Sequence, residues 1–146
     1  MRKRVMFLCT GNSARSQMAE GLARHMAGQE WEVFSAGLDP QGLNPYAVKA
    51  MSEIGIDISG QRSKAIDLNL LQTMDVIVTL CGDAEERCPV TPAGVLHLYW
   101  PLPDPAKVSG TDEEILAEFR RIRDEIRDRI AYLIGELGRE QSIPRG

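Results

Sequence analysis

Runs of apolar residues alternate along the chain with segments in which apolar residues recur every three or four positions. The runs predict four short, buried β-strands, rich in β-branched side chains, at residues 5–8, 32–37, 75–81 and 95–100. Each of the first three runs is followed by a turn-rich or helical segment before the next run begins.

Helical spacing marks the segments between these runs. The first helix is expected to begin near Ser16. The second begins at Asn44-Pro45, where asparagine is a favoured cap and proline suits the first turn, and it ends at Gly55. Residues 67–71 predict a short helical turn.

The last helix is the longest. It opens with a capping box formed by Thr111 and Glu114. A single apolar stripe runs along it, made by Ile115, Phe119, Ile122, Ile126, Ile130, Leu133 and Leu137. The tail from Gly138 onward is expected to fray.

This order of elements predicts an α/β fold. We expect a single domain over residues 1–146, with a four-stranded parallel sheet flanked by helices and right-handed crossovers. Ligands bind such sheets beyond the carboxyl ends of the strands. Cys9 ends the first strand, Cys81 ends the third and Asp104 follows the fourth, so all three should open onto one edge.

Composition narrows the class of protein. The chain has 146 residues and a net charge of −4, which does not favour binding to nucleic acid or to an anionic membrane. No segment is long enough to cross a bilayer. Three cysteines, an odd number, argue against a disulfide scaffold and for reactive thiols in a reducing cytoplasm. We expect a cytoplasmic monomer.

The loop after the first strand carries the clearest chemical signal. Cys9 precedes it and Arg15 follows it, with five residues between them: Thr10, Gly11, Asn12, Ser13 and Ala14. Gly11 and Asn12 tolerate a left-handed backbone, and small side chains let backbone N–H groups converge on an anion. The helix N-terminus adds positive charge and Arg15 a bidentate fork. Residues Thr10 to Ser16 therefore predict an oxyanion cradle beside a Cys9 thiolate.

The cradle must overcome repulsion between the thiolate and the bound anion. Two like charges about 4 Å apart cost roughly 4 kcal/mol at an effective dielectric constant near 20. Several charge-assisted hydrogen bonds, each worth about 1.5–3 kcal/mol, offset this. A buried structural cysteine with an unrelated surface arginine is the alternative, but the strand before the loop and the helix after it favour the cradle.

Residues 9–21 resemble the phosphate loop of the low-molecular-weight tyrosine phosphatase superfamily, with its Cys-x5-Arg loop after the first strand. Within that superfamily they most resemble thioredoxin-coupled arsenate reductases. Other stretches that resemble this branch are residues 35–37, 44–45, 55–59, 78–84 and 88–89. Cys9, Cys81 and Cys88 together are its specific mark, because a simple phosphatase needs only Cys9.

The resemblance implies a mechanism with arsenate as substrate and no cofactor. Cys9 attacks arsenic in the cradle with Arg15, and Asp104 acts as general acid. Cys81 then attacks Cys9, arsenite leaves, and Cys88 carries the disulfide outward for thioredoxin to reduce. Residual phosphatase activity is also implied.

Other functions remain open at this point. A low-molecular-weight protein tyrosine phosphatase would share Cys9, Arg15 and Asp104, but residues 38–41 and 106–107 offer no aromatic side chain for phosphotyrosine. An inactive oxyanion-binding or redox-sensing module is a third possibility. Zinc binding by Cys81 and Cys88 is not favoured, since no second Cys or His pair lies at finger spacing, and we expect no metal site.

Relatives of this kind can bind a potassium ion near the loop, through residues that match Asn12, Glu20 and Ser35. An acidic residue expected a little after Ser59 is replaced here by Lys64. We expect the Lys64 ammonium to take the place of the cation, so that potassium has little effect.

Overall fold

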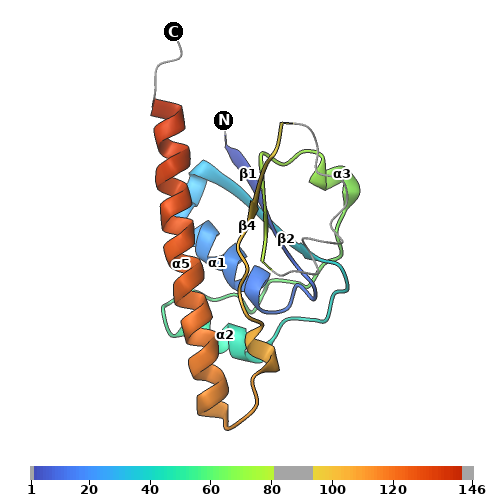
Figure 1. Ribbon diagram of the computed structural model, residues 1–146, viewed down its shortest axis with the longest axis vertical. Helices are drawn as coiled ribbons and strands as arrows, with labels where there is room; N and C mark the ends of the chain where they lie inside the picture. The colour runs from blue at the N-terminus through green and yellow to red at the C-terminus, as the bar shows by residue number, and fades with distance from the viewer. Residues whose placement is uncertain (1, 81–93, 143–146) are drawn as a thin grey trace.

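The computed structural model of the chain describes residues 2–80 and 94–142 (Figure 1). Its strands are β1 (Lys3–Cys9), β2 (Trp31–Gly37), β3 (Val76–Thr79) and β4 (Leu96–Tyr99). Its α-helices are α1 (Arg15–Ala27), α2 (Pro45–Ser52), α3 (Leu68–Leu71) and α5 (Asp112–Ser142). Two short 3-10 turns, η1 (Gly28–Glu30) and η2 (Pro105–Lys107), complete the described elements.

The four strands form one parallel sheet in the order β2-β1-β3-β4, which confirms the predicted fold class. β1 is central and pairs with both β2 and β3, so that Phe7 lies between Ser35 and Val78. Residues 5–9 are all buried because this strand has neighbours on both sides and is covered on both faces. β4 is an edge strand, and Leu96 and Tyr99 on it stay more than 40 % exposed.

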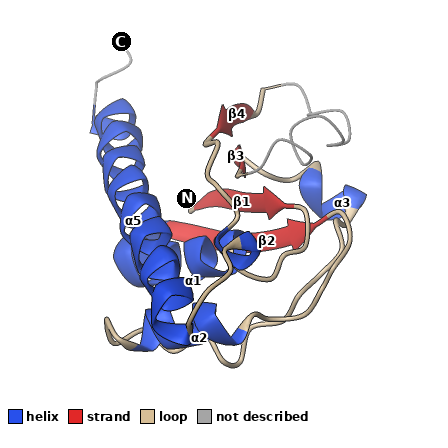
Figure 2. Ribbon diagram, turned by 60° about the horizontal axis from the view of Figure 1, so that its bottom comes forward, coloured by secondary structure: helices blue, strands red, loops and turns tan. Residues whose placement is uncertain are grey.

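Helices α1, α2 and α5 lie together in both views, whereas α3 lies apart from them (Figures 1 and 2). The apolar stripe of α5 faces the core: its buried members are Leu116, Phe119, Ile122, Ile126, Ile130, Leu133 and Leu137. This matches the predicted stripe except at the first position, where Leu116 is buried and Ile115 only partly so. No helix in the described part of the chain is both long and apolar enough to cross a membrane.

The predicted fraying from Gly138 is wrong for residues 138–142, because α5 continues to Ser142, and residues 143–146 lie outside the described residues. One glycine inside a helix costs only about 1 kcal/mol relative to alanine, and the residues after it are good helix formers. The N-terminal caps are as predicted, whereas α2 ends at Ser52 and not at the predicted Gly55. Asn44 accepts a hydrogen bond from the Tyr46 N–H, and Thr111 and Glu114 form the reciprocal capping box.

Candidate active site

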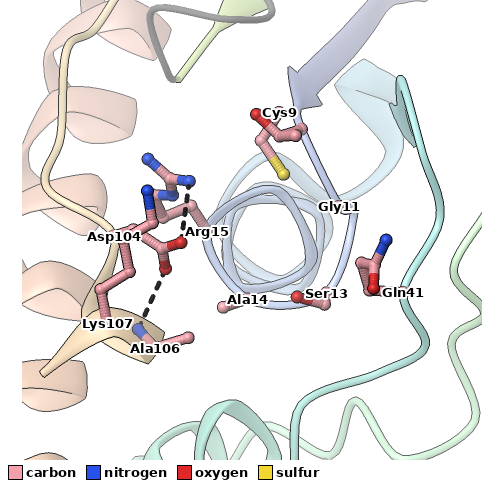
Figure 3. A pocket seen from close by; sticks show the side chains of 10 residues that line it. Cys9, Gly11, Ser13, Ala14, Arg15, Gln41, Asp104, Ala106 and Lys107 are labelled. Atoms are coloured by element: carbon pink, nitrogen blue, oxygen red, sulfur yellow. Dashed lines mark hydrogen bonds and ion pairs between the residues drawn. The ribbon is translucent and has the colours of Figure 1, made fainter. Parts of the chain in front are cut away.

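A cavity of about 640 Å³ opens at the carboxyl edge of the sheet (Figure 3). Its described lining residues are Cys9, Thr10, Gly11, Ser13, Ala14, Arg15, Gln41, Asp104, Ala106 and Lys107. They come from the end of β1, the start of α1, the segment after β2 and the turn η2. The sheet topology thus brings together side chains that are up to about a hundred positions apart in sequence.

The loop after β1 has its carbonyl groups turned away from the cavity. The five carbonyl oxygens of residues 9–13 accept hydrogen bonds, in chain order, from the backbone N–H groups of Leu38, Asp39 and Gln41, the side-chain amide of Gln17 and the backbone N–H of Asn44. In a trans peptide unit the N–H points opposite to the C=O, and the described residues contain no cis peptide bond. The amides of this loop therefore face inward, as a site for a tetrahedral anion requires.

Asn12 and Ser16, which belong to the predicted oxyanion cradle, are fully buried, and their side chains form hydrogen bonds within the protein. Asn12 adopts a left-handed backbone with φ of 46°. Its side-chain amide donates to the hydroxyls of Ser16 at 2.7 Å and Ser35 at 3.0 Å, and its carbonyl accepts from the Lys64 N–H at 2.7 Å. These two residues hold the shape of the loop, and Thr10, Gly11, Ser13 and Ala14 line the cavity.

The Cys9 sulfur lies at the bottom of the cavity, and the residue is only 2 % exposed. The Asn12 backbone N–H donates to Sγ at 3.2 Å, and the Ser16 hydroxyl lies 2.9 Å from it. The N-terminus of α1 begins at Arg15, with no acidic residue in its first turn. The sulfur therefore lies beside a backbone donor, a hydroxyl group and the positive end of the α1 dipole.

Arg15 and Asp104 lie next to each other on one wall of the cavity (Figure 3). The Arg15 guanidinium donates to the Leu102 carbonyl at 2.9 Å, and its second nitrogen lies 3.6 Å from the Asp104 carboxylate. The other oxygen of Asp104 accepts from the Ala106 N–H at 3.0 Å and so caps η2. Asp104 thus has both a turn role and a position beside the cavity.

Two glycines allow the loop to pack closely. A Cβ on Gly37 would lie 2.7 Å from the Asn12 backbone nitrogen, and one on Gly11 would lie 2.9 Å from the Gln41 side chain. No local sequence pattern marks Gly37, Gln41 or Lys107 as part of the site, because their closeness to the loop depends on tertiary packing.

The sequence profile of the low molecular weight phosphotyrosine protein phosphatase family matches residues 4–143. The chain belongs to this family. A curated relative from Shouchella clausii, named arsenate reductase, is 57 % identical over 129 residues, which cover 88 % of this chain and 93 % of the relative.

Solved members of this phosphatase family have the same fold. An arsenate reductase in the oxidized state superimposes with a TM-score of 0.78 at 37 % identity, covering 92 % of this chain and 98 % of that one. A thioredoxin-dependent arsenate reductase from Corynebacterium glutamicum gives 0.67 at 31 % identity, covering 90 % of this chain and 63 % of that one. The predicted resemblance to arsenate reductases of this phosphatase superfamily is confirmed.

The residues predicted for a cation site, Asn12, Glu20 and Ser35, do not fit potassium here. The Lys64 ammonium lies 3.4 Å from the Glu20 carboxylate, 3.5 Å from the Ser35 hydroxyl and 2.5 Å from the Arg62 carbonyl. Glu20 also pairs with Arg24 at 2.5 Å. The lysine charge therefore already neutralises the oxygens that a potassium ion would need. No group of metal-ligating side chains occurs among the described residues.

Cys81 and Cys88, the other two predicted catalytic cysteines, lie outside the described residues. Leu80, the residue after β3 and the last one described before these cysteines, donates its backbone N–H to the Leu8 carbonyl at 2.9 Å. Leu80 immediately precedes Cys81, and Leu8 immediately precedes Cys9.

Proposed function

We propose that this protein is an arsenate reductase in which Cys9 attacks arsenate and Cys81 and Cys88 complete a disulfide relay. The observation that carries the proposal is the anchoring of the five loop carbonyls away from the cavity, which turns the loop amides toward the space beside Cys9, Arg15 and Asp104. The relatives that are named arsenate reductases support arsenate as the oxyanion.

The first step is nucleophilic substitution at arsenic. Arsenate binds to the loop amides and to Arg15, and the Cys9 thiolate forms a bond to arsenic. One arsenic–oxygen bond breaks, and Asp104 donates a proton so that the oxygen leaves as water. Arsenic remains in its oxidised state in this adduct, so no electrons have yet been transferred.

The second step transfers the electrons. The Cys81 thiolate attacks the Cys9 sulfur, and the sulfur–arsenic bond breaks with its electron pair left on arsenic. Arsenite is released, and the two sulfurs that lost these electrons become the Cys9–Cys81 disulfide. The Cys88 thiolate then attacks Cys81, which frees the Cys9 thiolate and leaves a Cys81–Cys88 disulfide. The hydrogen bond between Leu80 and Leu8 supports this relay, because it joins the backbones next to the first two cysteines.

Thioredoxin is the proposed reductant of the Cys81–Cys88 disulfide, in a cytoplasmic setting and with no cofactor. The structural neighbour named thioredoxin-dependent supports this choice. A dithiol reductant supplies the two electrons that arsenate consumes in each cycle, so the reaction balances.

A phosphatase activity would share the first step, with phosphorus in place of arsenic and water as the final nucleophile. The family name favours this as a residual activity. None of the described residues that line the cavity is aromatic, and its mouth is formed by the exposed lining residues Gln41, Ala106 and Lys107. A phosphotyrosine ring would find no stacking partner among them, so a small inorganic oxyanion is the better substrate.

The relay is tested with Cys81→Ser and Cys88→Ser, assayed for arsenite production with thioredoxin and for hydrolysis of an aryl phosphate. The wild type is expected to turn over arsenate continuously. Cys81→Ser should release no arsenite, because its adduct is not resolved. Cys88→Ser should release one arsenite per enzyme and stop with a Cys9–Cys81 disulfide, detected by mass spectrometry.

Both variants should keep whatever aryl phosphatase activity the wild type has, since that activity needs only the residues of the loop and Asp104. Undiminished arsenate turnover in Cys81→Ser would overturn the relay. Aryl phosphate hydrolysis without any arsenate reduction in the wild type would make the protein a phosphatase instead.

A further inference from the structure

Lys107 is the one charged residue, among the described residues lining the cavity, that neither the loop nor the mechanism uses. It is the last residue of η2, and its backbone N–H donates to the Asp104 carbonyl at 3.2 Å. Pro105, at the start of the same turn, is buried and anchors it. The turn that positions the proposed general acid therefore also fixes the backbone from which the lysine side chain reaches the cavity.

Lys107 contributes a large share of the positive charge that the cavity lining offers to an anion. Among the described lining residues, charge is carried only by Arg15, Asp104 and Lys107. The Arg15 guanidinium donates to the Leu102 carbonyl and lies 3.6 Å from the Asp104 carboxyl group, so protein groups already engage its charge. Lys107 has no ion pair within the described chain, so no described carboxylate offsets its positive charge.

Arg15 and Lys107 also differ in exposure. The Arg15 side chain is 9 % exposed and is held by the Leu102 carbonyl, so it can act only on an anion already inside the cavity. Lys107 is exposed at the mouth, where a flexible side chain with a compact charge can meet an anion still in solvent. The whole chain carries a net charge of −4, which repels anions at long range, so a local cation at the entrance matters more.

We propose that Lys107 captures the inorganic oxyanion at the mouth of the cavity and passes it to the loop amides and Arg15. This role rests on the proposed function for the identity of the substrate. It assigns Lys107 to substrate capture rather than to bond breaking. Its removal should therefore act mainly on KM and on the salt dependence of kcat/KM.

The test compares Lys107→Ala with the wild type in two measurements. The first is binding of inorganic phosphate by isothermal titration, which needs no turnover. The second is kcat/KM for arsenate as a function of sodium chloride concentration. Losing one positive charge at the entrance should weaken phosphate binding roughly five- to tenfold and flatten the salt dependence.

Two further variants make the result specific. Lys107→Arg keeps the charge and should retain most of the binding and the salt dependence. Lys49→Ala removes the same charge from an exposed position on α2 that does not line the cavity, and it should behave like the wild type. Circular dichroism checks that each variant is folded.

The proposal is overturned if Lys107→Ala binds phosphate as tightly as the wild type and keeps its salt dependence. It is equally overturned if Lys49→Ala loses as much binding, since the effect would then be one of total charge. Weakened phosphate binding in Lys107→Ala alone supports it. If the wild type reduces no arsenate but Lys107→Ala still binds phosphate more weakly, the proposed function fails while the capture role stands.

Discussion

At Gly37 the end of β2 passes so close to the loop after β1 that no side chain fits between them. The atoms nearest to an added Cβ would be the Asn12 backbone nitrogen at 2.7 Å, the Asn12 Cβ at 2.9 Å and the Thr10 carbonyl oxygen at 2.9 Å. Backbone atoms of a hydrogen-bonded loop cannot rotate away as a side chain can. The shape of the cradle therefore depends on a missing methyl group outside the loop itself.

Gly37→Ala is expected to lower the free energy of unfolding by about 1–3 kcal/mol, as overpacking commonly does, and to abolish phosphate binding because the loop is displaced. Chemical denaturation and isothermal titration measure the two effects. Gly60→Ala is the matched control, since a Cβ there meets nothing within 4 Å. Normal phosphate binding by Gly37→Ala would show that the loop tolerates the contact.

Lys64 also helps to hold the loop after β1 in its shape. Its backbone N–H holds the Asn12 side chain, and its ammonium lies beside Glu20 and Ser35. The wild-type activity is expected to be the same in potassium as in sodium at equal ionic strength. Lys64→Met removes only the ammonium, and a stimulation by potassium should then appear. A clear potassium stimulation of the wild type would contradict this.

The motif from Cys9 to Arg15 could be identified from the sequence because its chemistry is local. Of the two residues predicted to tolerate a left-handed backbone, Asn12 adopts it, whereas Gly11 is needed for its close contact with Gln41. Gly37 and Lys107 approach the site only after the sheet has formed. No local pattern marks such residues.

At the scale of elements, α2 and α5 are joined by charges. Glu53, at the end of α2, accepts hydrogen bonds from Arg120 at 2.7–3.2 Å and from Arg123 at 3.2 Å. Arg123 also donates to the Ala50 carbonyl at 2.9 Å. The hydrogen bond with Arg120 is the main cause that lowers the pKa of Glu53 below its ordinary value of 4.5.

The sign of this shift predicts how stability depends on pH. A carboxylate with a lowered folded-state pKa stabilises the fold at every pH above its ordinary value, and the contribution disappears as the pH falls through the lowered pKa. Glu53→Gln should therefore lower the melting temperature at pH 7 and have progressively less effect below pH 4.5. Thermal unfolding across this range is the measurement.

Asp128→Asn on the exposed face of α5 serves as the control, because Asp128 has only a 3.8 Å contact with its neighbour Arg127. It should leave the melting temperature unchanged across the range. A difference between Glu53→Gln and the wild type that persists undiminished at low pH would exclude the charge as its cause.

Helices and strands with strong periodicity were predictable, including the capping box and the stripe on α5. The turn η2 was not, because three residues carry no periodicity. From the sequence, Asp104 before a proline fits either a general acid or a turn residue, and its carboxylate forms both the turn and the contact with Arg15. The end of α5 was not predictable from Gly138, because glycine ends many helices but does not end this one.

At the scale of the whole molecule, the parallel sheet is what assembles the site. Four strands that run in one direction place the end of β1 and the segment after β4 at one edge. The class of fold and the side of the sheet could therefore be predicted from the order of elements alone. The volume of the cavity and the residues at its mouth could not, since they depend on how the intervening segments pack.

The outward carbonyls of the loop are anchored to several separate parts of the chain, from α1 to the residues after β2 and the start of α2. A protein engineer who transplanted the loop into another strand–helix scaffold would move the nucleophile and leave its anchors behind. The peptide units would then be free to turn over, and their oxygens would repel the anion that the amides were meant to receive. A working graft would have to carry the partner segments with it.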